Sequence, residues 1–118
     1  MSNEREFDVV IFGATGFTGK LVAEYFQAQY GSDDNVKWAV AGRNEAKLNG
    51  VTKELGISES VASIVADGDD DDALDALTKR TAVVLTTVGP YQIYGEKLLS
   101  ACVDNGTGYI DLCGEPAW

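Results

Sequence analysis

Short apolar runs alternate with amphipathic stretches along the whole chain, and this alternation limits the fold more than any other feature of the sequence. Runs that are rich in β-branched residues and bounded by turn residues predict buried strands. Five such runs occur, at residues 7–12, 36–42, 60–67, 82–89 and 108–114. The stretches between them are predicted helices, at residues 16–31, 44–56, 70–80 and 94–106. Continuous apolar strands separated by helices favour a parallel sheet that is covered on both faces.

Right-handed crossovers between parallel strands restrict the order of the strands in such a sheet. They favour an α/β fold of three layers with a doubly wound parallel sheet in the strand order 3-2-1-4-5, the Rossmann fold. Asn44 and Gly56 are expected to begin and end the second helix. The inner faces expected for the first and fourth helices consist of Leu21, Val22, Tyr25 and Phe26, and of Leu98, Leu99, Cys102 and Val103.

The composition fits one small globular domain. The chain has 118 residues and is 45% hydrophobic, so a single domain over residues 1–118 can bury a core. No apolar run approaches the roughly 18 residues of a membrane span. The polar start MSNERE is followed by no signal-peptide core. A cytoplasmic location is therefore expected.

Charge and residue types exclude several classes of site. The chain has 19 acidic and 9 basic residues and a net charge of −10, so it lacks the basic footprint of a nucleic-acid-binding protein. It has no histidine, which excludes a Ser-His-Asp triad within the chain. The two cysteines, Cys102 and Cys113, form no CxxC pair, so we expect no metal site of the zinc type.

Much of the acidic excess lies in the run DGDDDDALDAL at residues 67–77. As a calcium loop, this run lacks the glycine at the sixth position and the terminal glutamate of an EF-hand. Acidic residues are favoured at the N-terminal end of a helix by the helix dipole, so a solvated helix start is the simpler interpretation. The acidity also favours a halophilic source, because a strongly charged surface keeps a protein soluble. Full stability of the purified protein without salt would contradict that hypothesis.

The first predicted strand leads into a glycine-rich turn, VVIFGATGFTGKL at residues 9–21. A P-loop requires G-x-x-x-x-G-K-[ST], but here five residues separate Gly13 from Gly19, and Leu21 follows the lysine. The spacing Gly13-x-x-Gly16-x-x-Gly19 instead matches the dinucleotide fingerprint of a first strand-to-helix turn. The turn therefore predicts a site for a dinucleotide.

Each glycine of the turn has an expected role. Gly13 allows the tight turn, Gly16 allows the backbone to approach the pyrophosphate, and Gly19 lets the helix pack closely. The backbone amides of residues 15–18 open the helix and face the phosphates, where the positive end of the helix dipole favours anions. The residues expected around the pyrophosphate are Gly13, Ala14, Thr15, Gly16, Phe17, Thr18 and Gly19.

The end of the second predicted strand bears on the choice between NAD and NADP. An acidic residue there would bind the ribose 2′-hydroxyl of NAD. The sequence has Gly42 followed by Arg43 instead, and a guanidinium suits the 2′-phosphate of NADP. Lys47 follows one helical turn later and adds positive charge. NADP is the favoured cofactor, with NAD as the alternative; a plain surface role for Arg43 is the competing interpretation.

Two further strand ends border the same predicted site. Asp67 ends the third strand, where it is expected either to accept a hydrogen bond from the adenine amino group or to cap the next helix. The fourth strand ends beside the first at the switch point and should border the pyrophosphate and the nicotinamide-side ribose. The residues expected there are Val88, Gly89, Pro90 and Tyr91.

Three segments together resemble the saccharopine dehydrogenase-like oxidoreductases, a group that includes the trans-acting enoyl reductases. The segments are GATGFTG at residues 13–19, AGR at residues 41–43 and VGPYQIYGEKLLSACVDNGTGYIDLCGEP at residues 88–116. The resemblance implies an NAD(P)-binding Rossmann domain and hydride-transfer chemistry. It places Arg43 at the adenosine end and Gly89, Pro90 and Tyr91 near the central ribose. It also implies that Asp111, Cys113, Gly114 and Glu115 lead toward a second domain that carries the small-molecule substrate.

Several functions are compatible with these features. The first is the cofactor domain of an NADP-dependent oxidoreductase whose second domain is missing from this chain. A non-catalytic module that senses NADP or binds a partner would share the glycine turn and Arg43. A short-chain dehydrogenase would use a Tyr-x-x-x-Lys pair, which no tyrosine of the chain provides. A bare edge carrying Ile93, Tyr94 and Trp118 would favour self-association into a homo-oligomer.

Overall fold

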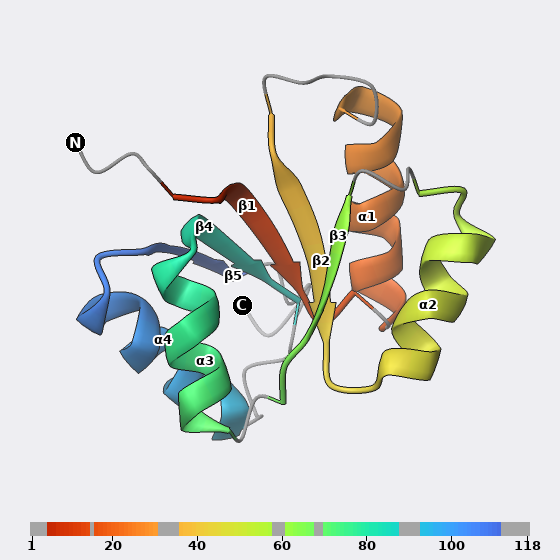
Figure 1. Cartoon of the computed structure of the whole chain (residues 1–118). Helices are drawn as coiled ribbons and strands as arrows, with labels where there is room; N and C mark the ends of the chain where they lie inside the picture. Colours follow the sequence, from red (N-terminus) through yellow and green to blue (C-terminus); the bar gives the residue numbers. More distant parts are fainter. Residues whose placement is uncertain are drawn as a thin grey trace, which may run out of the picture.

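In a computed structural model, the chain forms a parallel sheet with helices on both faces (Figure 1). The structure describes residues 5–14, 16–30, 36–57, 61–67, 70–87 and 93–111, without the side chains of residues 17, 93–96 and 111. Its elements are β1 (Phe7–Phe12), α1 (Phe17–Tyr30), β2 (Trp38–Gly42), α2 (Glu45–Glu54), β3 (Ala62–Val65), α3 (Asp71–Lys79), β4 (Thr81–Thr86), α4 (Ile93–Asp104) and β5 (Gly108–Asp111).

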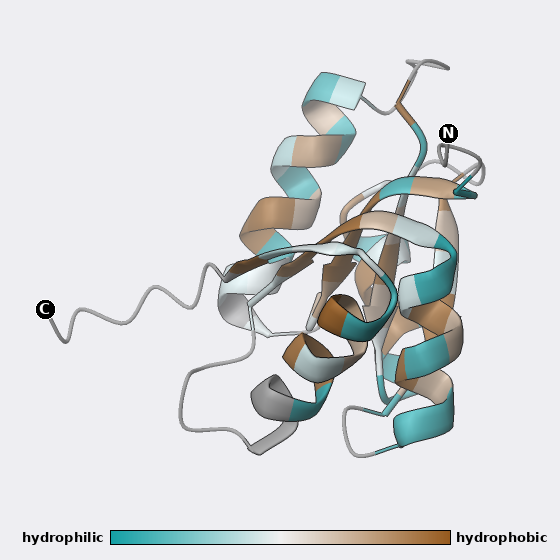
Figure 2. Cartoon of the chain, turned by 90° about the vertical axis from the view of Figure 1, so that its left-hand side faces the viewer, coloured by the Kyte–Doolittle hydropathy of each residue, from teal (hydrophilic) through white to brown (hydrophobic). Residues whose placement is uncertain are grey.

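The strand order confirms the predicted fold. The five strands lie in the order β3-β2-β1-β4-β5, and all neighbouring pairs are parallel. Helices α1 and α2 cover one face of the sheet, and α3 and α4 cover the other (Figure 1). The strands are largely apolar, whereas the helices present both apolar and polar residues (Figure 2). The chain therefore forms the three-layer, doubly wound α/β architecture that the alternating sequence predicts.

Two apolar cores lie on opposite faces of the sheet. On the α3 and α4 face, Val10 of β1 packs in a cluster with Leu98 and Cys102 of α4. On the α1 and α2 face, Ile11 belongs to a cluster with Ala23 of α1. Side chains alternate between the two faces along a strand, so the central strand β1 contributes to both cores.

The inner faces predicted for two helices are partly wrong. In α1, Leu21 and Tyr25 are 52% and 57% exposed, while the buried positions are those of Gly19 and Ala23. Small residues at these positions allow the helix backbone to lie close to the sheet, and the larger side chains then project past the edge of the contact.

In α4, only half of the predicted inner face packs against the sheet. Leu98 and Cys102 are buried, but Leu99 and Val103 are 44% and 70% exposed. Neighbouring residues on a helix point about 100° apart, so the residues that face the sheet are spaced one helical turn apart and their neighbours point away from it. Burial raises the pKa of the Cys102 thiol to about 11, which makes it a poor nucleophile near neutral pH.

Other local predictions are confirmed. The Asn44 side chain accepts a hydrogen bond from the Lys47 amide at 3.0 Å and caps α2. Gly56 follows that helix with φ of 67°, a conformation that favours glycine and ends the helix.

No helix in the described ranges combines the length and apolarity that a membrane crossing requires.

Arg5 ties the start of the chain to two turns at the N-terminal edge of the sheet. Its Nη1 donates to the carbonyl oxygens of Thr78 and Thr81, both at 2.8 Å, and to Oγ1 of Thr107 at 2.9 Å. Its Nη2 donates to the carbonyl oxygen of Asn105 at 2.7 Å. One guanidinium thus joins the turn between α3 and β4 to the turn between α4 and β5.

We predict that Arg5→Met destabilises the chain far more than Arg80→Met. The first substitution removes the Arg5 donor from the carbonyl oxygens of Thr81 and Asn105, although the Thr78 oxygen keeps the Thr107 hydroxyl, and it should cost about 2 kcal/mol. The second breaks an exposed bidentate pair in which Arg80 Nε and Nη2 lie 2.8 and 3.1 Å from the Glu6 carboxylate, and exposed pairs contribute little. Urea unfolding of both variants measures the difference, and equal losses would contradict the assigned role of Arg5.

Candidate functional site

The carboxyl ends of β1, β2, β3 and β4 all lie at one edge of the sheet because the strands are parallel. At this edge β1 lies between β2 and β4, where the strand order reverses direction. Ligands of open α/β sheets bind in the crevice beyond the carboxyl ends of strands at such a switch point. The glycine turn after β1 lies at this position.

The glycine turn is held against the end of β2. Gly13 adopts φ of 91°, a conformation that side chains other than glycine rarely take. The amides of Gly13 and Ala14 both donate to the Ala41 carbonyl oxygen, at 2.9 and 3.2 Å. The carbonyl oxygen of Gly13 in turn accepts the Gly16 amide at 3.1 Å, so the turn closes on itself.

The end of β4 holds the same turn from the other side. The Thr87 amide donates to the Phe12 carbonyl oxygen at 3.0 Å. The Thr87 hydroxyl lies 3.0 Å from the Gly13 carbonyl oxygen and 3.2 Å from that of Phe12. Nothing in the local sequence indicates this contact, because 74 positions separate Thr87 from Gly13.

Gly19 and Gly16 differ in what the fold requires of them. A Cβ atom at Gly19 would lie 2.0 Å from the Gly13 carbonyl oxygen and 2.8 Å from Cα of Ala14. The fold therefore requires a glycine at residue 19, because α1 packs there directly against the backbone of the glycine turn. A Cβ atom at the exposed Gly16 would find its nearest neighbour at 3.6 Å, an ordinary contact. The described residues leave room for a side chain at Gly16, yet the sequence has none there.

Helix α1 begins with backbone amides that point out of the helix start. The Lys20 amide donates to the Gly16 carbonyl oxygen at 2.9 Å and makes the first bond of the helix. The amides of Phe17, Thr18 and Gly19 precede that bond, and none of them has an acceptor within the described ranges. The first turn of α1 contains no acidic residue, whereas Glu45 occupies that of α2 and Asp71 and Asp72 that of α3. The positive end of this 14-residue helix, with no acidic side chain in its first turn, favours an anion.

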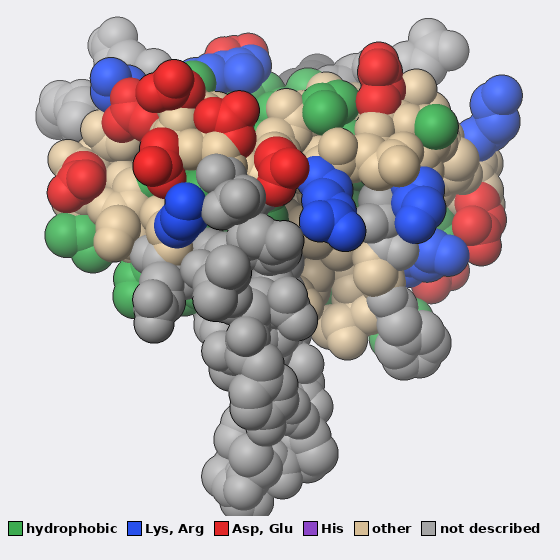
Figure 3. All heavy atoms as spheres, turned by 90° about the horizontal axis from the view of Figure 1, so that it is seen from below, with side chains coloured by type: hydrophobic (Ala, Val, Ile, Leu, Met, Phe, Trp, Pro, Cys, Tyr) green, Lys and Arg blue, Asp and Glu red, His purple; other side chains and the backbone are tan. Residues whose placement is uncertain are grey.

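Two basic residues follow β2, the strand beside β1. Gly42 ends β2 and is buried, and Arg43 follows it as an exposed residue. Lys47 lies exposed in the first turn of α2. Lys20 is 3.7 Å from Glu54, whereas neither Arg43 nor Lys47 forms an ion pair with any described residue. Figure 3 shows this edge, where Asp and Glu predominate over the α3 and α4 half and several Lys and Arg lie over the α1 and α2 half, with some side chains of the opposite charge on each half.

Asp67 does not cap a helix, so one of its two predicted roles is wrong. Helix α3 starts four residues later, and Oδ1 of Asp70 accepts the amides of Asp72 and Ala73, both at 3.1 Å. The capping carboxylate must directly precede the first turn, and Asp70 has that position. Asp67 is exposed after β3, and its role toward adenine stays a prediction.

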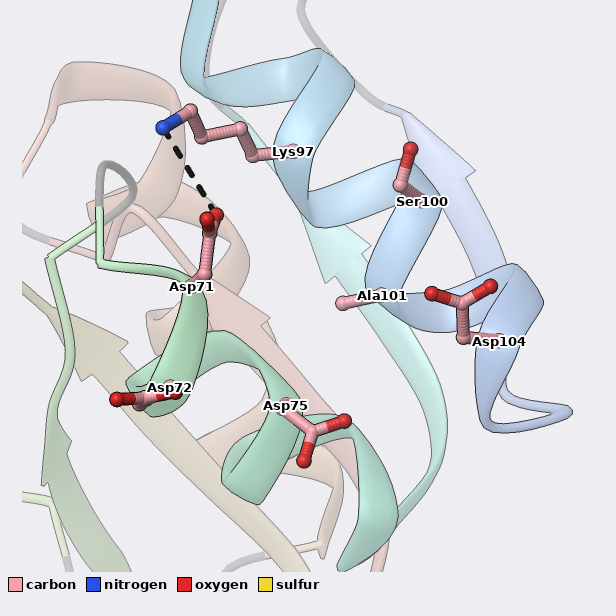
Figure 4. A pocket seen from close by; sticks show the side chains of 7 residues that line it. All are labelled: Asp71, Asp72, Asp75, Lys97, Ser100, Ala101 and Asp104. Atoms are coloured by element: carbon pink, nitrogen blue, oxygen red, sulfur yellow. Dashed lines mark ion pairs between the residues drawn. The ribbon is translucent and has the colours of Figure 1, made fainter.

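A groove of 610 Å³ between α3 and α4 is a poor place for a dinucleotide (Figure 4). It is lined by Asp71, Asp72, Asp75, Lys97, Ser100, Ala101 and Asp104. Four carboxylates oppose phosphate binding, and Lys97 lies 3.8 Å from Asp71. Within the acidic run, Asp70 caps α3 and Asp71 and Asp72 lie in its first turn, as the helix-start interpretation predicts. No three carboxylate or thiol side chains in the described part of the chain are arranged to hold a metal ion.

Several predicted residues lie outside the described part of the chain, so their placement stays a prediction. They are Thr15, Val88, Gly89, Pro90 and Tyr91 of the cofactor site, with Cys113, Gly114 and Glu115 of the passage beyond it. The same holds for Trp118 and for the side chains of Phe17, Ile93, Tyr94 and Asp111.

Comparison with known proteins decides the family. Residues 9–117 match the family model described as the saccharopine dehydrogenase NADP binding domain. The chain belongs to this family. The resemblance stated from the sequence is thereby confirmed, and NAD(P) is the cofactor of the domain.

Named relatives extend well beyond the matched region. The saccharopine dehydrogenase-like oxidoreductase of Rattus norvegicus is 42% identical over 125 residues, which cover 98% of this chain and 29% of the relative. The trans-acting enoyl reductase of Mycobacterium tuberculosis is 49% identical over 113 residues, which cover 95% of this chain and 26% of the relative. The chain thus spans less than a third of the length of these oxidoreductases.

Solved structures show the same fold. Apo saccharopine dehydrogenase (L-Glu forming) from Saccharomyces cerevisiae superposes with a TM-score of 0.66 at 24% identity. The match covers 89% of this chain and 21% of that one. The structure of Pen from Bacillus thuringiensis superposes with a TM-score of 0.71 at 12% identity, over 91% of this chain and 37% of that one.

We predict that Gly19→Ala destabilises the chain strongly, whereas Gly16→Ala hardly changes its stability. A methyl group at Gly19 would clash with the backbone of the turn and should cost about 3 kcal/mol by overpacking. The same group at Gly16 meets an ordinary contact and should leave the free energy of unfolding within about 0.5 kcal/mol of the wild type. Urea unfolding tests both variants. Equal destabilisation would contradict the distinction between a glycine that packs and a glycine that leaves space.

Proposed function

We propose that this chain forms one domain that holds NADP for hydride transfer, while a substrate domain outside the chain completes the active site. One observation carries the proposal. The glycine turn is tied to β2 and β4, Gly16 has room beside it among the described residues, and the amides of Phe17, Thr18 and Gly19 have no described acceptor. This combination fits a pyrophosphate, which needs close backbone approach and several N–H donors.

The glycine turn and the start of α1 would hold the pyrophosphate. The amides of Phe17, Thr18 and Gly19 are the donors that the described residues offer, and Gly16 admits the phosphates to them. Thr15 is assigned to the same cradle from the fingerprint spacing. The absence of acidic side chains in the first turn of α1 supports this role, because a carboxylate there would repel the ligand.

Arg43 and Lys47 would bind the 2′-phosphate at the adenosine end. Both are exposed cations beside the ends of β2 and β3, and neither pairs with a described carboxylate. A guanidinium can donate two parallel hydrogen bonds to a phosphate, which a 2′-hydroxyl cannot match. Gly42 keeps the backbone before Arg43 free of a side chain, and Asp67 would accept from the adenine amino group.

The nicotinamide would lie beyond the ends of β1 and β4, where Val88, Gly89, Pro90 and Tyr91 are assigned. NADP supplies or accepts the hydride, and the residues of this chain bind and orient it. The relatives are oxidoreductases that are more than three times as long as the matched part. Their length supports a separate substrate domain, and their enoyl reductase and saccharopine dehydrogenase names leave the substrate of this protein open.

We predict that the wild-type chain binds NADP at least about ten-fold more tightly than NAD, because charge-assisted hydrogen bonds to the 2′-phosphate favour NADP. Arg43→Ala should remove most of this preference by weakening NADP binding alone. Lys53→Ala is the matched control, since it removes an exposed cation from the last turn of α2, away from the start of that helix. Calorimetric titration of the wild type and of each variant with NADP and with NAD measures these affinities.

Gly16→Val tests the pyrophosphate site independently of the adenosine end. A branched side chain should block the phosphates and abolish binding of both cofactors, while the chain remains folded. Equal affinity of the wild type for NADP and NAD would contradict the role of Arg43. Undiminished binding by Gly16→Val would contradict the site itself.

A further inference from the structure

Thr87 follows the last residue of β4 and reaches the glycine turn from the strand beside β1. Its hydroxyl has one hydrogen to donate and lies 3.0 Å from the Gly13 carbonyl oxygen and 3.2 Å from that of Phe12. The Phe12 oxygen already accepts the Thr87 amide at 3.0 Å. The Gly13 oxygen likewise accepts one amide, that of Gly16 at 3.1 Å, and it is the nearer of the two acceptors of the hydroxyl.

The Gly13 oxygen belongs to the peptide group that joins Gly13 to Ala14. The N–H of this peptide donates to Ala41 of β2 at 3.2 Å, and its oxygen accepts from Thr87 beside β4 and from the Gly16 amide. A peptide group held at both ends cannot rotate without breaking these bonds. Because Gly19 packs directly on the same oxygen, the orientation of this peptide also fixes where α1 begins.

We propose that Thr87 is a positioning residue of the dinucleotide site, an inference that rests on the proposed function. Its hydroxyl fixes the Gly13 carbonyl and thereby the direction of the amides at the start of α1. Removing the hydroxyl removes none of the amide donors of the turn, but it takes away one of the hydrogen bonds that hold the turn to the residue after β4. The chain then folds with a less ordered turn and binds a pyrophosphate less tightly.

Two substitutions at Thr87 and one matched control isolate the hydroxyl. Thr87→Val keeps the shape and removes the donor, whereas Thr87→Ser keeps the donor. Thr81→Val is the control at the opposite end of β4, where the Thr81 hydroxyl donates to the Leu77 carbonyl oxygen at 2.7 Å. Urea unfolding establishes that each variant is folded under the conditions of the other measurements.

Amide hydrogen exchange in the ligand-free chain gives the first readout, because it reports local opening of the turn. Exchange of the Gly16 amide, followed by NMR, should be at least about five-fold faster in Thr87→Val than in the wild type if one neutral hydrogen bond is lost. Thr87→Ser and Thr81→Val should exchange at the wild-type rate at this position. Unchanged exchange in Thr87→Val would overturn the proposal.

Ligand affinity gives the second readout. Thr87→Val should bind NADP about five-fold more weakly, and Thr87→Ser should restore the affinity. Adenosine 2′-monophosphate, which has no pyrophosphate, should bind Thr87→Val and the wild type equally. Equal weakening of both ligands would show a general disturbance and overturn the proposal. Failure of the wild type to bind NADP would instead contradict the proposed function, while the exchange measurement would still decide the role of Thr87 in the turn.

Discussion

The contact between the backbone of α1 and the turn after β1 determines how the carboxyl edge of the sheet is arranged. The helix can lie against the Gly13 carbonyl because Gly19 has no side chain, and the turn can present that carbonyl because Gly13 tolerates a positive φ. Bonds from Ala14 to β2 and from Thr87 beside β4 then fix the turn from two sides. The start of α1 consequently lies at the switch point of the sheet.

Charge makes the position of this helix start important. The net charge of −10 opposes the approach of a phosphate over most of the surface. At the carboxyl edge, acidic residues predominate over α3 and α4, whereas several basic residues lie over α1 and α2 beside a few acidic ones (Figure 3). Helix α1 also lacks the acidic first turn that α2 and α3 have. An anion therefore meets favourable charge beside the glycine turn and unfavourable charge at the groove between α3 and α4.

Features encoded by neighbouring residues could be predicted from the sequence, and features made by distant residues could not. The glycine spacing, the strand order, and the Asn44 cap depend on local pattern, and the structure has all three. The exposed Leu21 and Val103 were assigned to inner faces because apolar type alone does not say which row of a helix meets the sheet. The bonds of Thr87 and Arg5 join residues more than 70 positions apart, so no local pattern indicates them.

Threonine hydroxyls form structural hydrogen bonds at both ends of strand β4. At its start, the Thr81 hydroxyl donates to the last turn of α3, next to the carbonyls that Arg5 holds. Just past its end, the Thr87 hydroxyl donates to the Gly13 carbonyl beneath the start of α1. The first bond closes a helix at the edge opposite the glycine turn, and the second orients donors that the fold leaves open at the carboxyl edge. Stability and ligand recognition can therefore respond separately to the same chemical change, because the remaining residues of β4, 82–86, separate Thr81 from Thr87.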